Sequence, residues 1–255
     1  MFADIAAKMA FGRPRVHKTE SLTATERALQ SSATDRERPI LAICGTPEDR
    51  LAWDPIWRLL VTNHRFDAHS LWLDAEDRQR VLKHRCPRKT PAADFIALAQ
   101  ALTRESGSPI HVLGWLEGGD IALRAVLQAP NLFRSLTLFD PRISEILNHI
   151  AEGSSIEADF FRDPADTKKS LPIRIPEPVL PAPPAINVAT LSALEIDALL
   201  MTGEASHPRD QIAVEWLAAH LPNATERVWR ENGRKGLFEN PEIIANEIAA
   251  FLVAT

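Results

Sequence analysis

Apolar positions along the chain form two patterns, short continuous runs and stripes at helical spacing. Six short segments are predicted as strands: 40–44, 66–73, 110–113, 135–139, 197–202 and 225–230. The last of them is not an apolar run, because it contains Glu226, Arg227 and Arg230. Stripes at three- and four-residue spacing predict helices between them: 53–60, 95–102, 121–128, 210–220 and 241–252. Strands that alternate with helices through short connections favour an α/β protein with a mainly parallel sheet covered by helices on both faces.

Two segments depart from this alternation. Residues 1–38 contain no strand pattern, and their apolar residues recur at helical spacing only near the start, at Phe2, Ile5 and Met9. Residues 142–190 begin with a helical pattern and continue with six prolines between Pro172 and Pro184. We therefore expect an N-terminal extension over 1–38, partly helical or mobile, and one domain over 39–255 with a short Pro-rich cap at about 142–190.

Composition excludes several classes of function. The net charge of −5 over 255 residues lacks the basic character of a nucleic-acid-binding domain. The absence of tyrosine removes every mechanism that uses a phenol as acid or base. Two cysteines are too few for a disulfide framework or a thiolate zinc site, and no histidine shows metal-ligand spacing, so we expect no metal and no cofactor.

Location is predicted from the same composition. The longest uncharged stretch, 178–194, contains four prolines, which is incompatible with an uninterrupted membrane-spanning helix. Residues 1–20 lack the apolar block of a secretory signal, because Asp4 and Lys8 interrupt it. We therefore expect a cytoplasmic protein with no membrane span.

The turn between the third run and the helix that follows it reads G-W-L-E-G-G, residues 114–119. It resembles the nucleophile elbow of the α/β-hydrolase fold, G-x-S-x-G, which also lies between a strand and a helix. Three more segments are similar to blocks of that family: 43–60 to its oxyanion loop and helix, 199–208 to its acid strand, and 231–252 to its histidine loop and last helix. The four blocks occur in the family's order, so the resemblance implies an α/β-hydrolase-like fold.

The resemblance fails at the positions that carry the nucleophile and the base. Leu116 stands at the nucleophile position of the elbow, and its side chain has no lone pair to attack with. Arg234 stands in the loop where the family has its histidine, and a guanidinium cannot accept a proton. No histidine follows His220. The resemblance therefore implies a retained fold without Ser-His-Asp chemistry, as in a pseudoenzyme.

The acid and the oxyanion loop are altered as well. Ser206 lies near the usual position of the triad aspartate, and Asp140 occupies the alternative position after the preceding strand. Cys44 replaces the histidine of the family's oxyanion loop. By the resemblance, six residues line the former active-site cleft or the oxyanion site: Gly45, Thr46, Trp115, Leu116, Glu117 and Arg234.

Four residues are candidates for substitute chemistry. A thiolate at Cys44 is a possible nucleophile, although a lone cysteine on an apolar strand is more often a small buried hydrophobe. Glu117 carries a carboxylate beside the elbow, where the helix N-terminus favours the ionised form, and the alternative is a capping or surface residue. His207 would need a nucleophile within hydrogen-bond reach, and Asp140 is the remaining acid.

Two hypotheses about function follow. The first is a non-catalytic protein that binds a small apolar or acyl ligand in the former cleft, or a protein partner or second copy through residues 1–38 and the cap. The second is a noncanonical ester, thioester or lactone hydrolase or a lyase that uses Cys44, Glu117 or His207 with the elbow amides as an oxyanion site.

Overall fold

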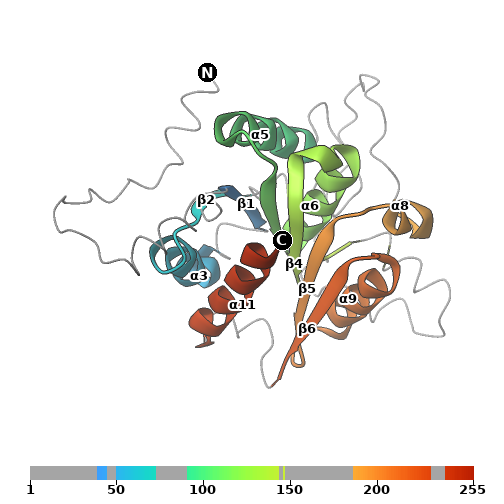
Figure 1. The fold of residues 1–255 in the computed structure, drawn as a ribbon. Coiled ribbons are helices and arrows are strands. Elements are labelled where there is room, and N and C mark those ends of the chain that lie inside the picture. The colour runs from blue at the N-terminus through green and yellow to red at the C-terminus, as the bar shows by residue number, and fades with distance from the viewer. Residues whose placement is uncertain (1–38, 45–49, 73–90, 144–145, 147–185, 231–238) are drawn as a thin grey trace, which may run out of the picture.

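The computed structural model describes residues 39–44, 50–72, 91–143, 146, 186–230 and 239–255. Within these ranges, six strands form a single sheet in which every neighbouring pair is parallel, in the order β2-β1-β3-β4-β5-β6 (Figure 1). The strands are β1 (Pro39–Cys44), β2 (Asp67–Trp72), β3 (Ile110–Trp115), β4 (Phe133–Phe139), β5 (Asp197–Gly203) and β6 (Ala224–Trp229). The helices are α3 (Arg50–Thr62), α5 (Pro91–Ser106), α6 (Glu117–Gln128), the short η3 (Pro130–Leu132), α8 (Val188–Ser192), α9 (Pro208–His220) and α11 (Pro241–Ala254).

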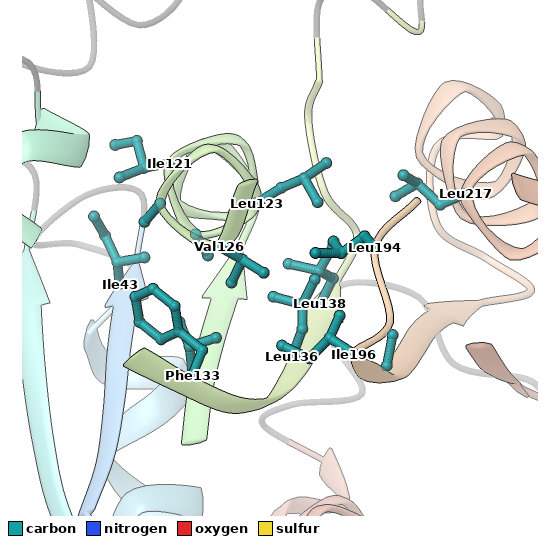
Figure 2. Close-up of a cluster of buried hydrophobic side chains, with 14 of the residues drawn as sticks. Ile43, Ile121, Leu123, Val126, Phe133, Leu136, Leu138, Leu194, Ile196 and Leu217 are labelled. Atoms are coloured by element: carbon teal, nitrogen blue, oxygen red, sulfur yellow. The ribbon is translucent and has the colours of Figure 1, made fainter. Parts of the chain in front are cut away.

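Helices cover the sheet on both faces, and successive strand residues contribute to the two sides in turn. Helices α3 and α11 lie on one face, where Leu113 and Trp115 of β3 join their apolar cluster. Helices α5, α6 and α9 lie on the other, where Val112 of β3 contributes. Figure 2 shows part of this second cluster, with Leu123 of α6 and Leu217 of α9 among the packed side chains. Burial on both faces explains why the central strands are continuous apolar runs.

The order of the strands reverses once, between β1 and β3. From β1 the chain passes through α3 to β2, then returns through α5 to β3 on the other side of β1 and continues outward to β6. In open α/β sheets, ligands bind beyond the carboxyl ends of the strands at such a reversal. Strand β1 ends there at Cys44 and β3 at Trp115. The topology therefore places these two predicted site residues at this edge of the sheet.

The predicted strands and helices are confirmed, with bounds that differ by a few residues. The largest local difference is at the turn predicted over 114–119. Strand β3 continues through Trp115 and α6 begins at Glu117, so the turn consists of Leu116 alone. The strand can continue because Gly114 has no side chain to meet the first turn of α6.

The extension predicted over 1–38 lies outside the described residues, as does most of the cap predicted over 142–190, including nearly all of the helix expected near 143–151. The short helix α8 begins within the range assigned to the cap and ends two residues beyond it. None of the helices in the described ranges has the length and apolar character needed to cross a bilayer.

Candidate functional site

The turn between β3 and α6 holds Leu116 in a backbone conformation that residues with a side chain rarely adopt. Its φ of 51° and ψ of −122° lie outside the common regions for L-residues. Hydrogen bonds hold this peptide: Leu116 N–H donates to the carbonyl oxygen of Phe139 (3.2 Å), and Leu116 C=O accepts from the N–H groups of Gly119 (2.9 Å) and Arg142 (3.0 Å). The strained strand-to-helix turn of a nucleophile elbow is therefore built in this chain.

Two glycines allow this turn to form. A Cβ at Gly114 would lie 2.7 Å from the Cα of Gly119 and 2.8 Å from the carbonyl oxygen of Gly118. A Cβ at Gly119 would lie 2.7 Å from the Cβ of Pro141, in the segment that follows β4. These approaches are closer than real Cβ contacts, so the glycines of the G-W-L-E-G-G motif serve packing between β3, α6 and the chain after β4.

The side chain at the apex of the elbow is apolar and buried. Leu116 is 2% exposed and belongs to the cluster that α3 and α11 cover, together with Phe139 of β4 and Met201 of β5. It can contribute dispersion and hydrophobic energy there, but it has no atom that attacks an acyl carbon. The elbow thus places a packing residue where a nucleophile would stand.

The two positions that the resemblance offers for a triad acid meet in space. Asp140, directly after β4, is fully buried, and its carboxylate accepts hydrogen bonds from Thr202 Oγ1 (2.7 Å) and Ser206 Oγ (2.8 Å). Ser206 Oγ also accepts from the N–H of Gly203 (3.1 Å). Asp140 has a φ of 43°, a second strained backbone beside that of Leu116. Two hydroxyl groups thus hold the carboxylate of Asp140, and its assignment to the triad acid position stays a prediction.

Removal of one of these hydroxyl donors tests their contribution to stability. We expect Ser206→Ala to lower the free energy of unfolding by about 1–3 kcal/mol, because a buried carboxylate and the N–H of Gly203 each lose a partner. Ser192→Ala is the control: its exposed hydroxyl donates only a long bond to His220 C=O (3.4 Å), so the loss should stay within about 0.5 kcal/mol. Urea unfolding measures both, and equal losses would contradict the interpretation.

Glu117 lies in a buried network of charges rather than at the surface. It is fully buried, and its Oε1 accepts a hydrogen bond from Nη1 of Arg142 at 2.8 Å. Nε of Arg142 is 3.9 Å from Oδ1 of Asp210, which also accepts from Nε of Arg209 (3.3 Å). The interpretation of Glu117 as a surface carboxylate is therefore wrong, because the first turn of α6 packs against the segment after β4 that contains Arg142. A capping role stays a prediction.

Sequence reasoning missed Arg142, Asp210 and Thr202. The sequence contains a signal for Arg142, because this residue follows a buried strand, Asp140 and Pro141. A charged side chain at such a position needs a partner. Asp210 was read only as the start of a helix. Thr202 lies in an apolar run, where the strand pattern gives no reason to assign it a polar partner.

Two histidines with described side chains, His207 and His111, are held by hydrogen bonds. His207 is half-buried at the start of α9, and its Nδ1 accepts from the N–H of Arg209 at 3.2 Å. His111 is fully buried in β3, and its Nδ1 lies 2.8 Å from Oγ of Ser135. In this arrangement His207 serves as the N-cap residue of α9.

Other predicted site residues are described only in part. The backbone of Cys44 ends β1, but its side chain lies outside what the structure describes, as do Gly45, Thr46 and Arg234. Trp115 and Leu116 are buried, and whether they line a cleft stays a prediction. In the described ranges, no three His, Cys, Asp or Glu side chains are grouped so that they could hold a metal ion.

Comparisons with known proteins agree with this architecture. No protein-family model matches the chain, and no match is found among curated proteins. Solved structures do match. Carboxylesterase CesB from Bacillus subtilis gives a TM-score of 0.56 at 15% identity, over 86% of this chain and 85% of that one. A protein described as a predicted CIB-like hydrolase from Thermoplasma acidophilum gives 0.55 at 15% identity, over 86% and 88%.

A third structure carries the fold in its description. MGS-MChE2, an α/β hydrolase from a sediment metagenome of the Mar Chica lagoon, gives a TM-score of 0.51 at 15% identity, over 84% of this chain and 90% of that one. Identities at this level establish the fold and not the activity. The chain therefore has the α/β-hydrolase fold that the elbow motif predicted.

Proposed function

We propose that this protein acts by binding and not by Ser-His-Asp catalysis. The observation that carries the proposal is Leu116 at the apex of a fully formed elbow. The strained backbone, the two packing glycines and the flanking strand and helix of a nucleophile elbow are present, while the attacking atom is missing. Nucleophile and base act as a unit, and loss of either removes most of the rate enhancement.

The histidine that would act as the base is also missing from the loop where the family has it. No histidine follows His220, and His220 itself belongs to α9, where its Nδ1 is 2.7 Å from the carbonyl oxygen of Trp216. Asp140, the remaining acid, accepts hydrogen bonds from the hydroxyl groups of Thr202 and Ser206. These contacts support a site that has been converted from catalysis to packing and binding.

A small apolar or acyl molecule is the ligand that this site favours. The side chains at the carboxyl ends of β3 and β4 on the α3 and α11 face are apolar, including Trp115, Leu116 and Phe139. Contact with a protein partner or a second copy through residues 1–38 and the cap stays a prediction, and so does a cytoplasmic location. Residues 1–38 and most of the cap lie outside the described residues.

The contacts described for Glu117 and His207 do not favour the enzymatic alternative. Oε1 of Glu117 is bonded to Arg142, and Nδ1 of His207 accepts from the backbone at the start of α9. Neither contact joins a base to a nucleophile, which covalent catalysis requires at hydrogen-bond distance. The remaining candidate, Cys44, is addressed by experiment.

Turnover of short acyl esters and thioesters tests the proposal. The parent protein should show no turnover above the uncatalysed rate, and Leu116→Ser should not create a triad-type enzyme, because the loop where the family has its histidine contains none. In serine proteases, loss of the nucleophile or the base alone lowers kcat on the order of 10⁶-fold. Release of the alcohol or thiol is measured by absorbance, with circular dichroism to confirm that each variant is folded.

Cys44→Ala separates the two hypotheses. If the parent turns over an ester or thioester and Cys44→Ala abolishes that activity, the protein is a cysteine-dependent enzyme and the binding proposal is wrong. If neither protein is active, the substitution also serves as a control for background hydrolysis in the preparation.

A further inference from the structure

Helices α3 and α11 pack against each other on one face of the sheet, and their outer sides are exposed (Figure 1). The outer sides meet where Nε2 of His64, just after α3, lies 2.9 Å from Oδ1 of Asn246 in α11. Asn246 is exposed, and His64 is half-buried. The outer sides of the two helices therefore form one continuous surface.

Both parts of this surface contain an exposed apolar residue. Val61 of α3 is 37% exposed and Ile243 of α11 is 54% exposed. Each lies one turn before the residue of its own segment that makes the contact between His64 and Asn246. One exposed apolar side chain is ordinary on a protein surface, but two at the same junction are a small apolar centre of the kind that interfaces contain.

The charges around this centre differ in sign between the two helices. Arg58 and Arg65 are exposed on the α3 side, and Glu239 and Glu242 are exposed at the start of α11. In the part of the chain that the structure describes, none of these four side chains makes an ion pair. The surface thus carries a basic half and an acidic half that are available to an external partner.

We propose that this surface is the interface of a homodimer. The α3–α11 surface consists of six exposed residues: Arg58, Val61, Arg65, Glu239, Glu242 and Ile243. In an interface with twofold symmetry, the same patch is used by both copies, so a basic half of one copy meets an acidic half of the other. A surface with one half of each sign is complementary to itself, which selects a second copy of this chain as the partner.

The twofold axis passes near His64 and Asn246, where the two halves meet. Val61 of each copy then packs on Ile243 of the other, and the arginines of α3 face the glutamates of α11 in both directions. This inference goes beyond the proposed function, because it needs no ligand at the elbow.

The size of the surface indicates how tight the dimer is. Helices of 13 and 14 residues are each about 20 Å long, and packed helices lie about 10 Å apart. A patch of these dimensions is near the lower limit of specific interfaces, which bury about 1,000 Å² in total. We therefore expect a dimer that dissociates in the micromolar range.

Sedimentation velocity of the full chain between about 1 and 100 µM brackets such a dissociation constant. The average mass should rise from one chain towards two with concentration. Ile243→Glu should weaken the dimer at least about tenfold, because it places a charge in the apolar centre. Val188→Glu is the matched control: Val188 is 45% exposed on α8, which packs through Leu191 on the opposite face of the sheet.

Exchange of the charges tests the pairing directly. The chain with Arg58→Glu and Arg65→Glu has two acidic halves, and the chain with Glu239→Lys and Glu242→Lys has two basic halves. Each should be monomeric alone, because like charges face each other in its homodimer. An equimolar mixture should form a one-to-one heterodimer, since opposite charges then face each other at both contacts. Circular dichroism confirms that each chain is folded.

Four results would overturn the inference. They are a parent protein that stays monomeric up to the highest concentration, a dimer that Ile243→Glu leaves intact, an equal loss in Val188→Glu, and folded charge-exchanged chains that do not associate when mixed. A dimer that persists in Ile243→Glu would show that the copies meet through another part of the chain.

Discussion

Arg142→Met should lower the free energy of unfolding by about 3–5 kcal/mol, because it removes the cation of a buried ion pair and the hydrogen bond that this cation donates to Glu117. The two side chains are 6% and 0% exposed and their atoms are 2.8 Å apart. Arg142 also lies 3.9 Å from Asp210, so its loss removes the positive charge that faces two buried carboxylates. Chemical denaturation with urea measures the effect.

An exposed ion pair serves as the control. Arg227 and Glu247 are 2.6 Å apart but 51% and 34% exposed, so Arg227→Met should cost only about 0–1 kcal/mol. The double variant Glu117→Gln, Arg142→Met should recover part of the loss, because neither charge is then left alone. A similar small loss for both arginines would show that solvent reaches the Glu117 and Arg142 pair and would contradict the buried network.

The second large effect is expected at the elbow. Gly114→Ala should destabilise the protein by about 3 kcal/mol or more, or prevent folding, because the new Cβ would lie 2.7 Å from Gly119 Cα and 2.8 Å from Gly118 C=O. Both contacts are with backbone, which cannot rotate away as a flexible side chain can. The soluble yield and the urea midpoint of the purified variant report the outcome.

Gly107→Ala separates this clash from the ordinary cost of replacing a glycine. Gly107 has a φ of +72°, and an added Cβ would meet nothing within 4 Å. Its replacement should therefore cost only the left-handed backbone strain, about 1–2 kcal/mol. If Gly114→Ala were no worse than Gly107→Ala, the close approach of β3 to α6 would not limit stability.

The sequence by itself determined the architecture and the loss of the nucleophile. Apolar runs and helical stripes depend on which faces of each element are buried, and this periodicity is local. The elbow motif located the turn to within a few residues, and the identity of Leu116 is sufficient to exclude attack from that position. The order of strands and helices along the chain can therefore be predicted without knowledge of contacts between distant residues.

Only the tertiary structure decided how the polar residues are paired. Asp140 meets Thr202 and Ser206 across 62 and 66 residues of chain, because β4 and β5 are neighbours in the sheet. Glu117 appeared from the sequence to be a capping or surface residue, and its burial follows from the packing of α6 against the segment that contains Arg142. Such pairings depend on strand order and close packing, which local periodicity does not encode.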